Sequence, residues 1–208
     1  LFSNDWKTAS NLVEQVSTTP ESSETQFVTV RLVPEAGTAA GYARIAITPQ
    51  TNSTPTSGII AVNCGGSSYT GTDGTVYQAD TYYVGGHTDT FPGYAVANTA
   101  DDLLYNYARS GFSAYNIPLT NGSYTVTLKF AETYWNAAGK RVFDMALEGS
   151  PVIDDLDLYA AAPGKWVAYD LQFPVTVTDG QLNITASASV NNVLLNAIVI
   201  SPLPDPAP

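Results

Sequence analysis

The feature of this chain that most restricts its fold is a series of short runs in which apolar and polar residues alternate. The clearest run is SYTVTLKF at residues 123–130, which places Tyr124, Val126, Leu128 and Phe130 on one face. A period of two is that of a β-strand with one buried face. A short apolar run that ends in glycines lies at residues 59–66, and further strand-like runs lie at residues 141–149, 166–178, 181–190 and 193–201. Many short strands at roughly even spacing predict an all-β fold, a jelly-roll β-sandwich.

Two local signals refine this prediction. The segment TADDLLYNYARSG at residues 99–111 has a helical pattern, with Asp101 and Asp102 near its start and Gly111 just past its end. The Asp179–Gly180 pair, between two of the strand runs, is typical of a tight turn. We therefore expect one short helix in an otherwise β-rich domain.

Residues 1–57 differ in texture from the rest of the chain. They contain two strand-like runs, QFVTVRLV and GYARIAI, separated by the glycine-containing PEAGTAA. Two strands alone are marginally stable in water, because their backbone groups need further partners. We expect residues 26–48 to form a β-hairpin or strand pair that completes a sheet, through an upstream module or through exchange between subunits. The predicted organisation is a small β-strand appendage and linker at 1–57, a sandwich at 58–201 and a proline-rich tail at 202–208.

Charge and composition exclude several classes of function. Eight Lys and Arg residues against 19 Asp and Glu residues give a net charge of −11, which argues against nucleic acid and against anionic membrane surfaces. The sequence contains no apolar stretch long enough for membrane insertion. A single cysteine, Cys64, and a single histidine, His87, exclude zinc-finger sites and disfavour a Ser/His triad. We expect neutral or cationic partners, no metal and no other cofactor.

Several segments in one order carry a family resemblance. They are AVNCGGSSYTGTDGTVYQAD at 61–80, DDLLYNYARSG at 101–111, FAETYW at 130–135, KRVFDMALEG at 140–149 and NNVLLNAIVI at 191–200. Together they resemble malectin and the bacterial malectin-like domains, carbohydrate-binding module family 57, over about residues 58–201. The resemblance implies a β-sandwich whose loops at one end bind glucose oligosaccharides.

Within this resemblance, the aromatic pair that follows the Ala-Glu motif belongs to the sugar site. The matching residues are Tyr134 and Trp135, at a strand end before a glycine-containing loop. A pyranose ring has an apolar C–H face and hydroxyl groups at its rim, so an aromatic ring can stack on the face while fixed polar groups bind the rim. The alternative is that both rings pack against a neighbouring strand or against residues 1–57.

Other binding positions of the family match less closely. A second binding tyrosine of the family falls on Ser110, whereas the preceding Arg109 is kept. The family's binding aspartate near the last strand falls on Asn191, which forms hydrogen bonds but carries no charge. A further tyrosine belongs in the segment 80–98, where the candidates are Tyr82, Tyr83 and Tyr94.

Some residues allow a catalytic or metal-binding interpretation. Glu132 and Asp144 could form a glycosidase carboxylate pair, but Glu132 belongs to the family motif and Asp144 lies in the middle of a predicted strand. The acidic segment DDLDLY at 154–159 could bind calcium, although we expect a solvated loop there. His87, beside two glycines, is either a donor at the rim of the site or an exposed side chain. We expect no catalytic residue.

The sequence therefore predicts a non-catalytic carbohydrate-binding domain within a larger secreted or cell-surface protein. Its ligand would be a neutral glucan or related oligosaccharide, held by aromatic stacking in a site at the loop end. The alternative function is a structural or adhesive module of an extracellular filament, in which residues 1–57 contact other copies or an upstream module. A glycosidase is a third and weaker alternative.

Overall fold

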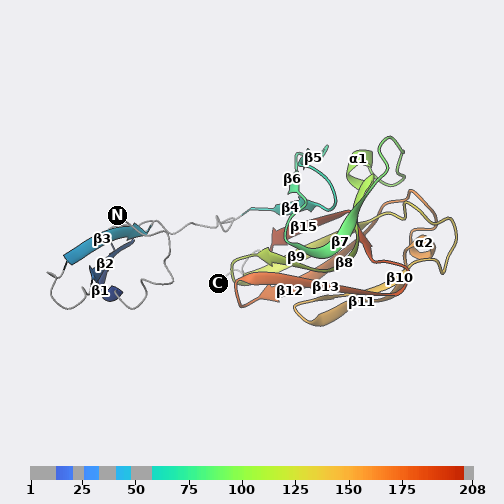
Figure 1. Cartoon of the computed structure of the whole chain (residues 1–208). Coiled ribbons are helices and arrows are strands. Elements are labelled where there is room, and N and C mark those ends of the chain that lie inside the picture. The colour runs from blue at the N-terminus through green and yellow to red at the C-terminus, as the bar shows by residue number, and fades with distance from the viewer. Residues whose placement is uncertain (1–12, 21–25, 33–40, 48–57, 204–208) are drawn as a thin grey trace, which may run out of the picture. The chain divides into compact units, whose positions relative to one another are not determined.

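The computed structural model describes residues 13–20, 26–32, 41–47 and 58–203, and the chain divides into the units Leu1–Ser53 and Thr54–Pro208 (Figure 1). In the first unit, strands β1 (Val13–Pro20), β2 (Gln26–Leu32) and β3 (Gly41–Ile47) form an antiparallel sheet in the order β1-β2-β3. The predicted hairpin is therefore present as β2 and β3. The sequence pattern did not predict β1. Strand exchange through this unit stays a prediction.

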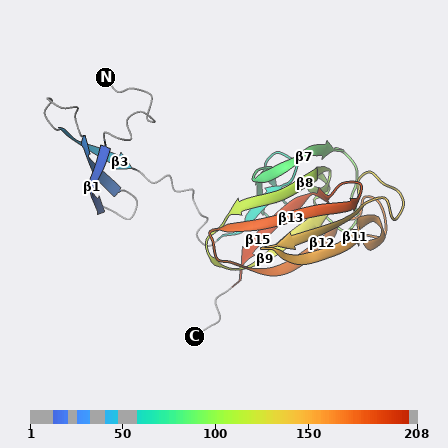
Figure 2. The ribbon, with the colours of Figure 1, turned by 60° about the horizontal axis from the view of Figure 1, so that its bottom comes forward.

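The second unit contains two six-stranded sheets (Figure 2). The first follows the order β12 (Tyr169–Val177), β9 (Gly122–Phe130), β15 (Ala197–Pro202), β4 (Ile60–Asn63), β6 (Val76–Ala79) and β5 (Tyr69–Thr70). The second follows the order β11 (Ser150–Asp157), β10 (Val142–Leu147), β13 (Gln181–Val190), β8 (Tyr107–Pro118) and β14 (Leu194–Leu195), and β7 (Tyr83–Thr90) also pairs with β8. The predicted β-sandwich is confirmed.

The apolar faces of both sheets form the core. Along β9, the four predicted inward residues Tyr124, Val126, Leu128 and Phe130 are buried and alternate with partly exposed neighbours. On β10 of the other sheet, Phe143 is buried and its ring centroid lies 5.8 Å from that of Phe130. Burial of these side chains supplies the main stabilising free energy, about 1.5–3 kcal/mol for each large apolar residue.

The short helix predicted within 99–111 is present, but it is shorter than the pattern indicated. Only Asp102–Tyr105 forms a helix, α1, and strand β8 begins at Tyr107. Residues 109 and 110 pair with β7 on one side and with β14 on the other. These two ladders satisfy the backbone groups of a segment whose local pattern favours a helix, so tertiary pairing overrides propensity.

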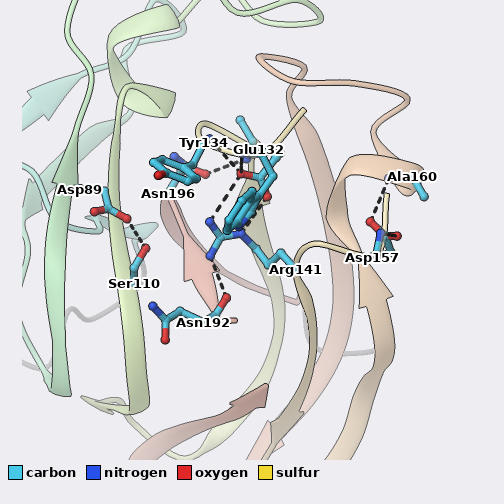
Figure 3. Close-up of polar contacts among 12 residues, drawn as sticks. Asp89, Ser110, Glu132, Tyr134, Arg141, Asp157, Ala160, Asn192 and Asn196 are labelled. Carbon is cyan, nitrogen blue, oxygen red and sulfur yellow. Dashed lines mark hydrogen bonds and ion pairs between the residues drawn. The ribbon is translucent and has the colours of Figure 1, made fainter. Parts of the chain in front are cut away.

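The acidic segment 154–159 is also not the solvated loop that we expected. It contains the end of β11 and the start of a second short helix, α2 (Leu158–Ala161). Asp157 caps this helix, because its side chain accepts a hydrogen bond of 3.2 Å from the backbone N–H of Ala160 (Figure 3). No helix in the described part of the chain is long and apolar enough to cross a membrane.

Candidate functional site

A cavity of about 380 Å³ lies where β7, β8 and two connecting segments of the sandwich, β9–β10 and β13–β14, meet. Its lining residues are His87, Asp89, Ser110, Tyr134, Trp135, Arg141, Asn191 and Asn192. Asp89 and Ser110 lie on one side of it, and Tyr134 and Arg141 on the other (Figure 3). One wall is therefore aromatic and the facing wall is polar.

The aromatic wall is held by a buried carboxylate directly after β9. Glu132 is completely buried, and its Oε1 accepts hydrogen bonds of 2.9 Å from the backbone N–H groups of both Tyr134 and Trp135. The chain consequently turns around this carboxylate. The two rings meet edge to face with centroids 4.8 Å apart, and Tyr134 is 59% exposed. Glu132 thus presents an aromatic pair whose backbone is fixed before any ligand binds.

Arg141 connects this aromatic turn to the turn between β13 and β14. Its Nε donates to Glu132 Oε2 over 2.7 Å, and its Nη1 donates to the backbone carbonyl of Asn192 over 2.8 Å. Both members of the ion pair are buried, so the cost of removing two charges from water must be offset by close hydrogen bonds. The neighbouring Asn191 has a left-handed backbone, with φ of 60°. One arginine therefore positions two of the segments that line the cavity.

The polar wall comes from the β7–β8 pair. His87 and Asp89 lie two residues apart on one face of β7, and His87 pairs with Ser110 of β8. The Ser110 hydroxyl donates to Asp89 Oδ2, and His87 Nε2 lies 3.4 Å from Asp89 Oδ1. Gly86 permits this close approach, because a Cβ atom there would lie 2.5 Å from the Ser110 carbonyl oxygen.

The cavity brings together three of the seven binding residues proposed from the sequence, namely Tyr134, Trp135 and Asn191. His87 also lines it, with a side chain that is 59% exposed. The other four residues do not line this cavity: Arg109, Tyr82, Tyr83 and Tyr94. Asp89, Arg141 and Asn192 are lining residues that the sequence reasoning missed.

Arg109 belongs to a separate buried cluster. Its guanidinium pairs with the Asp80 carboxylate at 2.6 Å, and the Tyr83 ring covers it with the centroid 3.5 Å from Cζ. Tyr115 adds a hydrogen bond of 2.9 Å from its hydroxyl to Asp80. Burial raises the pKa of Tyr115 above its ordinary value, and the negative charge of Asp80 adds to this shift. Arg109 of β8 is thus joined to the residue that directly follows β6 of the other sheet.

The two remaining tyrosines lie on the surface. Tyr94 is 52% exposed and stacks on Trp166, with ring centroids 4.4 Å apart and an interplanar angle of 3°. Tyr82, just before β7, has a left-handed backbone with φ of 68°. Neither side chain is among those that face Trp135 across the cavity.

The carboxylates considered for catalysis are engaged in structural contacts. Both oxygens of Glu132 accept hydrogen bonds, from two backbone N–H groups and from Arg141, inside the protein. Asp144 accepts a hydrogen bond of 2.7 Å from the backbone N–H of Asp155. The Ser110 hydroxyl donates its hydrogen bond to the Asp89 carboxylate.

Comparison with known proteins places this geometry in a family. The model of the Malectin domain family matches residues 58–200. Malectin-B of Xenopus laevis is 31% identical over 139 residues, which is 62% of this chain and 49% of that protein. A probable leucine-rich repeat receptor-like serine/threonine-protein kinase of Arabidopsis thaliana is 30% identical over 160 residues, 59% of this chain and 16% of that protein.

A solved structure supports the same fold. Bacteroides uniformis β-glucuronidase 2, covalently bound to cyclophellitol-6-carboxylate aziridine, superposes with a TM-score of 0.65 at 18% identity, covering 89% of this chain and 23% of that chain. At that identity the similarity concerns the fold alone. The chain spans about half the length of the malectin that it matches. With a family model that matches most of its length, the chain belongs to the Malectin domain family of carbohydrate-binding β-sandwich domains.

Proposed function

We propose that this chain is a non-catalytic carbohydrate-binding domain that binds a neutral glucan or related oligosaccharide in the cavity beside Tyr134 and Trp135. The observation that carries this proposal is the fixed aromatic pair opposite a polar wall. Stacking of a pyranose on Tyr134 and Trp135 would cover its apolar face. The hydroxyl rim would then meet Asp89, Ser110 and Asn191, which offer hydrogen-bond donors and acceptors.

The charges around the cavity favour a neutral sugar. The positive charge of Arg141 is balanced by Glu132 at 2.7 Å, whereas Asp89 lines the cavity and its nearest cationic candidate is the exposed His87. The whole chain carries a net charge of −11. An anionic sugar would therefore meet repulsion both in the cavity and during approach.

The domain would act within a larger secreted or cell-surface protein. Support comes from the receptor-like kinase of Arabidopsis thaliana, in which a similar segment makes up 16% of the protein. The low content of charged residues, 13%, also fits a module whose surface consists mostly of uncharged polar side chains. In such a protein this domain would bind the glycan, and other domains would carry the protein's further activities.

Calorimetric titration of the full chain with a panel of glucose disaccharides tests this function. Trp135→Ala should weaken binding by about 5- to 150-fold, the scale of one stacked ring by analogy with base–aromatic stacking. Tyr94→Ala is the matched control, because it removes an exposed stacked ring outside the cavity. Equal affinity of Trp135→Ala and the native chain, with both folded, would contradict the proposal.

A second candidate function is an adhesive module that assembles by strand exchange. The observation that favours it is the separate sheet of β1, β2 and β3, whose outer strands β1 and β3 each pair on one side only within the described residues. Unpaired strand edges can add a strand from another chain. Deletion of residues 1–57 should then abolish assembly, measured by light scattering, while the sandwich stays folded; unchanged assembly would overturn this candidate.

A further inference from the structure

Asp89 is the residue of the cavity with the greatest unused capacity to accept hydrogen bonds. Among the eight residues that line the cavity, it is the one that carries a carboxylate. The nearby carboxylate of Glu132 is completely buried and is occupied by Arg141 and by the aromatic turn. Asp89 is therefore the charged acceptor to which a ligand hydroxyl group in the cavity can donate a hydrogen bond.

Counting acceptor sites shows what Asp89 could bind. An ionised carboxylate offers about four lone-pair positions on its two oxygens. Ser110 occupies one position on Oδ2, and His87 Nε2, 3.4 Å from Oδ1, occupies at most one more. About two positions remain, and the side chain is 29% exposed, so a ligand can reach them. Two neighbouring hydroxyl groups of one sugar ring supply two donors at a suitable spacing.

The other polar groups of the cavity are weaker candidates for this task. The Ser110 hydroxyl proton is already donated to Asp89, and Arg141 donates to Glu132 and to the Asn192 carbonyl. The amide of Asn191 is neutral. Hydrogen bonds to an ionised acceptor are about twice as strong as those between neutral groups, so Asp89 dominates hydroxyl recognition.

We propose that Asp89 determines the specificity of the site: it accepts hydrogen bonds from two adjacent hydroxyl groups of a neutral hexose stacked on Tyr134 and Trp135, and it repels sugars that carry a carboxylate. This inference rests on the proposed function. It adds a binding residue from β7, on the wall opposite the aromatic pair, and a requirement for a free vicinal diol.

The test uses the full chain and measures affinity for a glucose disaccharide, for its monodeoxy derivatives and for glucuronic acid. Asp89→Asn keeps the size of the side chain but removes its charge and one acceptor oxygen. We expect this variant to bind the disaccharide about 10- to 100-fold more weakly, as for a lost hydrogen bond to a charged group. Asp154→Asn removes one exposed carboxylate outside the cavity and is the matched control.

The monodeoxy sugars identify the two hydroxyl groups without depending on a variant. The native chain should lose affinity when either of two adjacent hydroxyls is removed, and Asp89→Asn should lose little more on those same sugars. The ratio of the affinity for the glucose disaccharide to that for glucuronic acid should also be smaller in Asp89→Asn than in the native chain. Weak binding by Trp135→Ala with unchanged binding by Asp89→Asn would overturn the role of Asp89 alone. Absence of binding by the native chain to every disaccharide would overturn the proposed function and this inference with it.

Discussion

Two buried arginine–carboxylate pairs in this sandwich have nearly the same geometry but different surroundings. Arg141 pairs with Glu132 at 2.7 Å, and Arg109 pairs with Asp80 at 2.6 Å. All four side chains are at most 8% exposed. Around the first pair, the remaining hydrogen bonds reach the aromatic turn and the Asn192 carbonyl, both at the cavity. The second pair is instead surrounded by tyrosines of β7 and β8.

The difference between the two pairs shows that burial of an ion pair does not by itself indicate a binding site. The Arg109 pKa lies above its ordinary value, because the hydrogen bond to Asp80 and its charge outweigh the lowering that burial alone would cause. Such a perturbed group is a natural functional candidate. Yet the cavity lies at Arg141. What distinguishes the two pairs is which backbone segments they hold in place.

The largest expected effect comes from removing one arginine from each pair. Arg141→Met and Arg109→Met each leave a buried carboxylate without its cation, so each should lower the free energy of unfolding by about 3–5 kcal/mol. Only Arg141→Met should also weaken sugar binding, because it releases both the aromatic turn and the Asn191–Asn192 turn. Denaturant unfolding and calorimetric titration, at a temperature where both variants are folded, measure the two quantities.

Equal losses of affinity in the two variants would contradict the distinction between the pairs. Such a result would mean that global stability, rather than the position of Arg141, governs binding. Arg141→Lys provides an intermediate case, since it keeps the charge but cannot form the same two directed hydrogen bonds. Compared with Arg141→Met, Arg141→Lys should regain part of the free energy of unfolding and a smaller part of the sugar affinity.

The next comparison removes the tyrosine beside each pair. Tyr134→Ala should reduce sugar affinity by about 1–3 kcal/mol, as expected for a lost stacking ring, with little change in stability because the side chain is 59% exposed. Tyr83→Ala removes the ring that covers Arg109 and should reduce stability by about 0.5–2 kcal/mol. Its affinity should equal that of the native chain. A loss of affinity in Tyr83→Ala would return Tyr83 to the binding residues proposed from the sequence.

These contacts also explain which parts of the molecule the sequence could predict. Alternation in β9 and β10 identified the buried residues correctly, because the inward face of a strand in a sandwich must be apolar. The helical pattern at 99–111 predicted a helix that is too long. Strand β8 replaces its second half, because the pairing of β8 with β7 and β14 depends on residues far along the chain. Local patterns determine which face is buried, whereas long-range pairing determines which local preference is overridden.

The candidate site divides in the same way. The Ala-Glu motif pointed to Tyr134 and Trp135, because the turn around Glu132 is local in sequence. The hydrogen bond from Arg141 to the Asn192 carbonyl joins residues 51 positions apart, so no local sequence pattern predicts it. Asp89 could have been found from its period-two spacing to His87, had the segment been recognised as a strand. Its glycines and its β-bulge near Gly85 obscured that pattern.

A smaller effect is expected from the glycines that set the distance between β7 and β8. Gly85 and Gly86 both have left-handed backbones, with φ of 74° and 75°. Gly86→Ala should cost about 1–3 kcal/mol more in stability than Gly85→Ala, because only its Cβ would overlap the Ser110 carbonyl. It should also weaken sugar binding by displacing the polar wall. Equal unfolding free energies for the two variants would show that strand spacing here is adjustable.

The smallest expected effect concerns alkaline pH and the Arg109 cluster. The Tyr115 pKa is raised by burial, so the folded chain keeps this proton where tyrosines of the unfolded chain ionise, above about pH 10. The unfolded state then binds fewer protons, and the free energy of unfolding must fall as pH rises. Tyr115→Phe should flatten this decline between pH 9 and pH 11. The same slope as in the native chain would show that Tyr115 does not contribute to it.

The most direct test of the proposed sugar site is a nuclear magnetic resonance titration of the indole N–H signals with a glucose disaccharide. The chain has three tryptophans, of which Trp135 lines the cavity and Trp166 stacks on Tyr94 outside it. We predict that the Trp135 signal shifts with sugar concentration and follows a single binding curve, while the Trp166 signal stays unchanged. A shift of Trp166 without a shift of Trp135, or no shift of either at saturating sugar, would contradict the assignment of this cavity as the carbohydrate site.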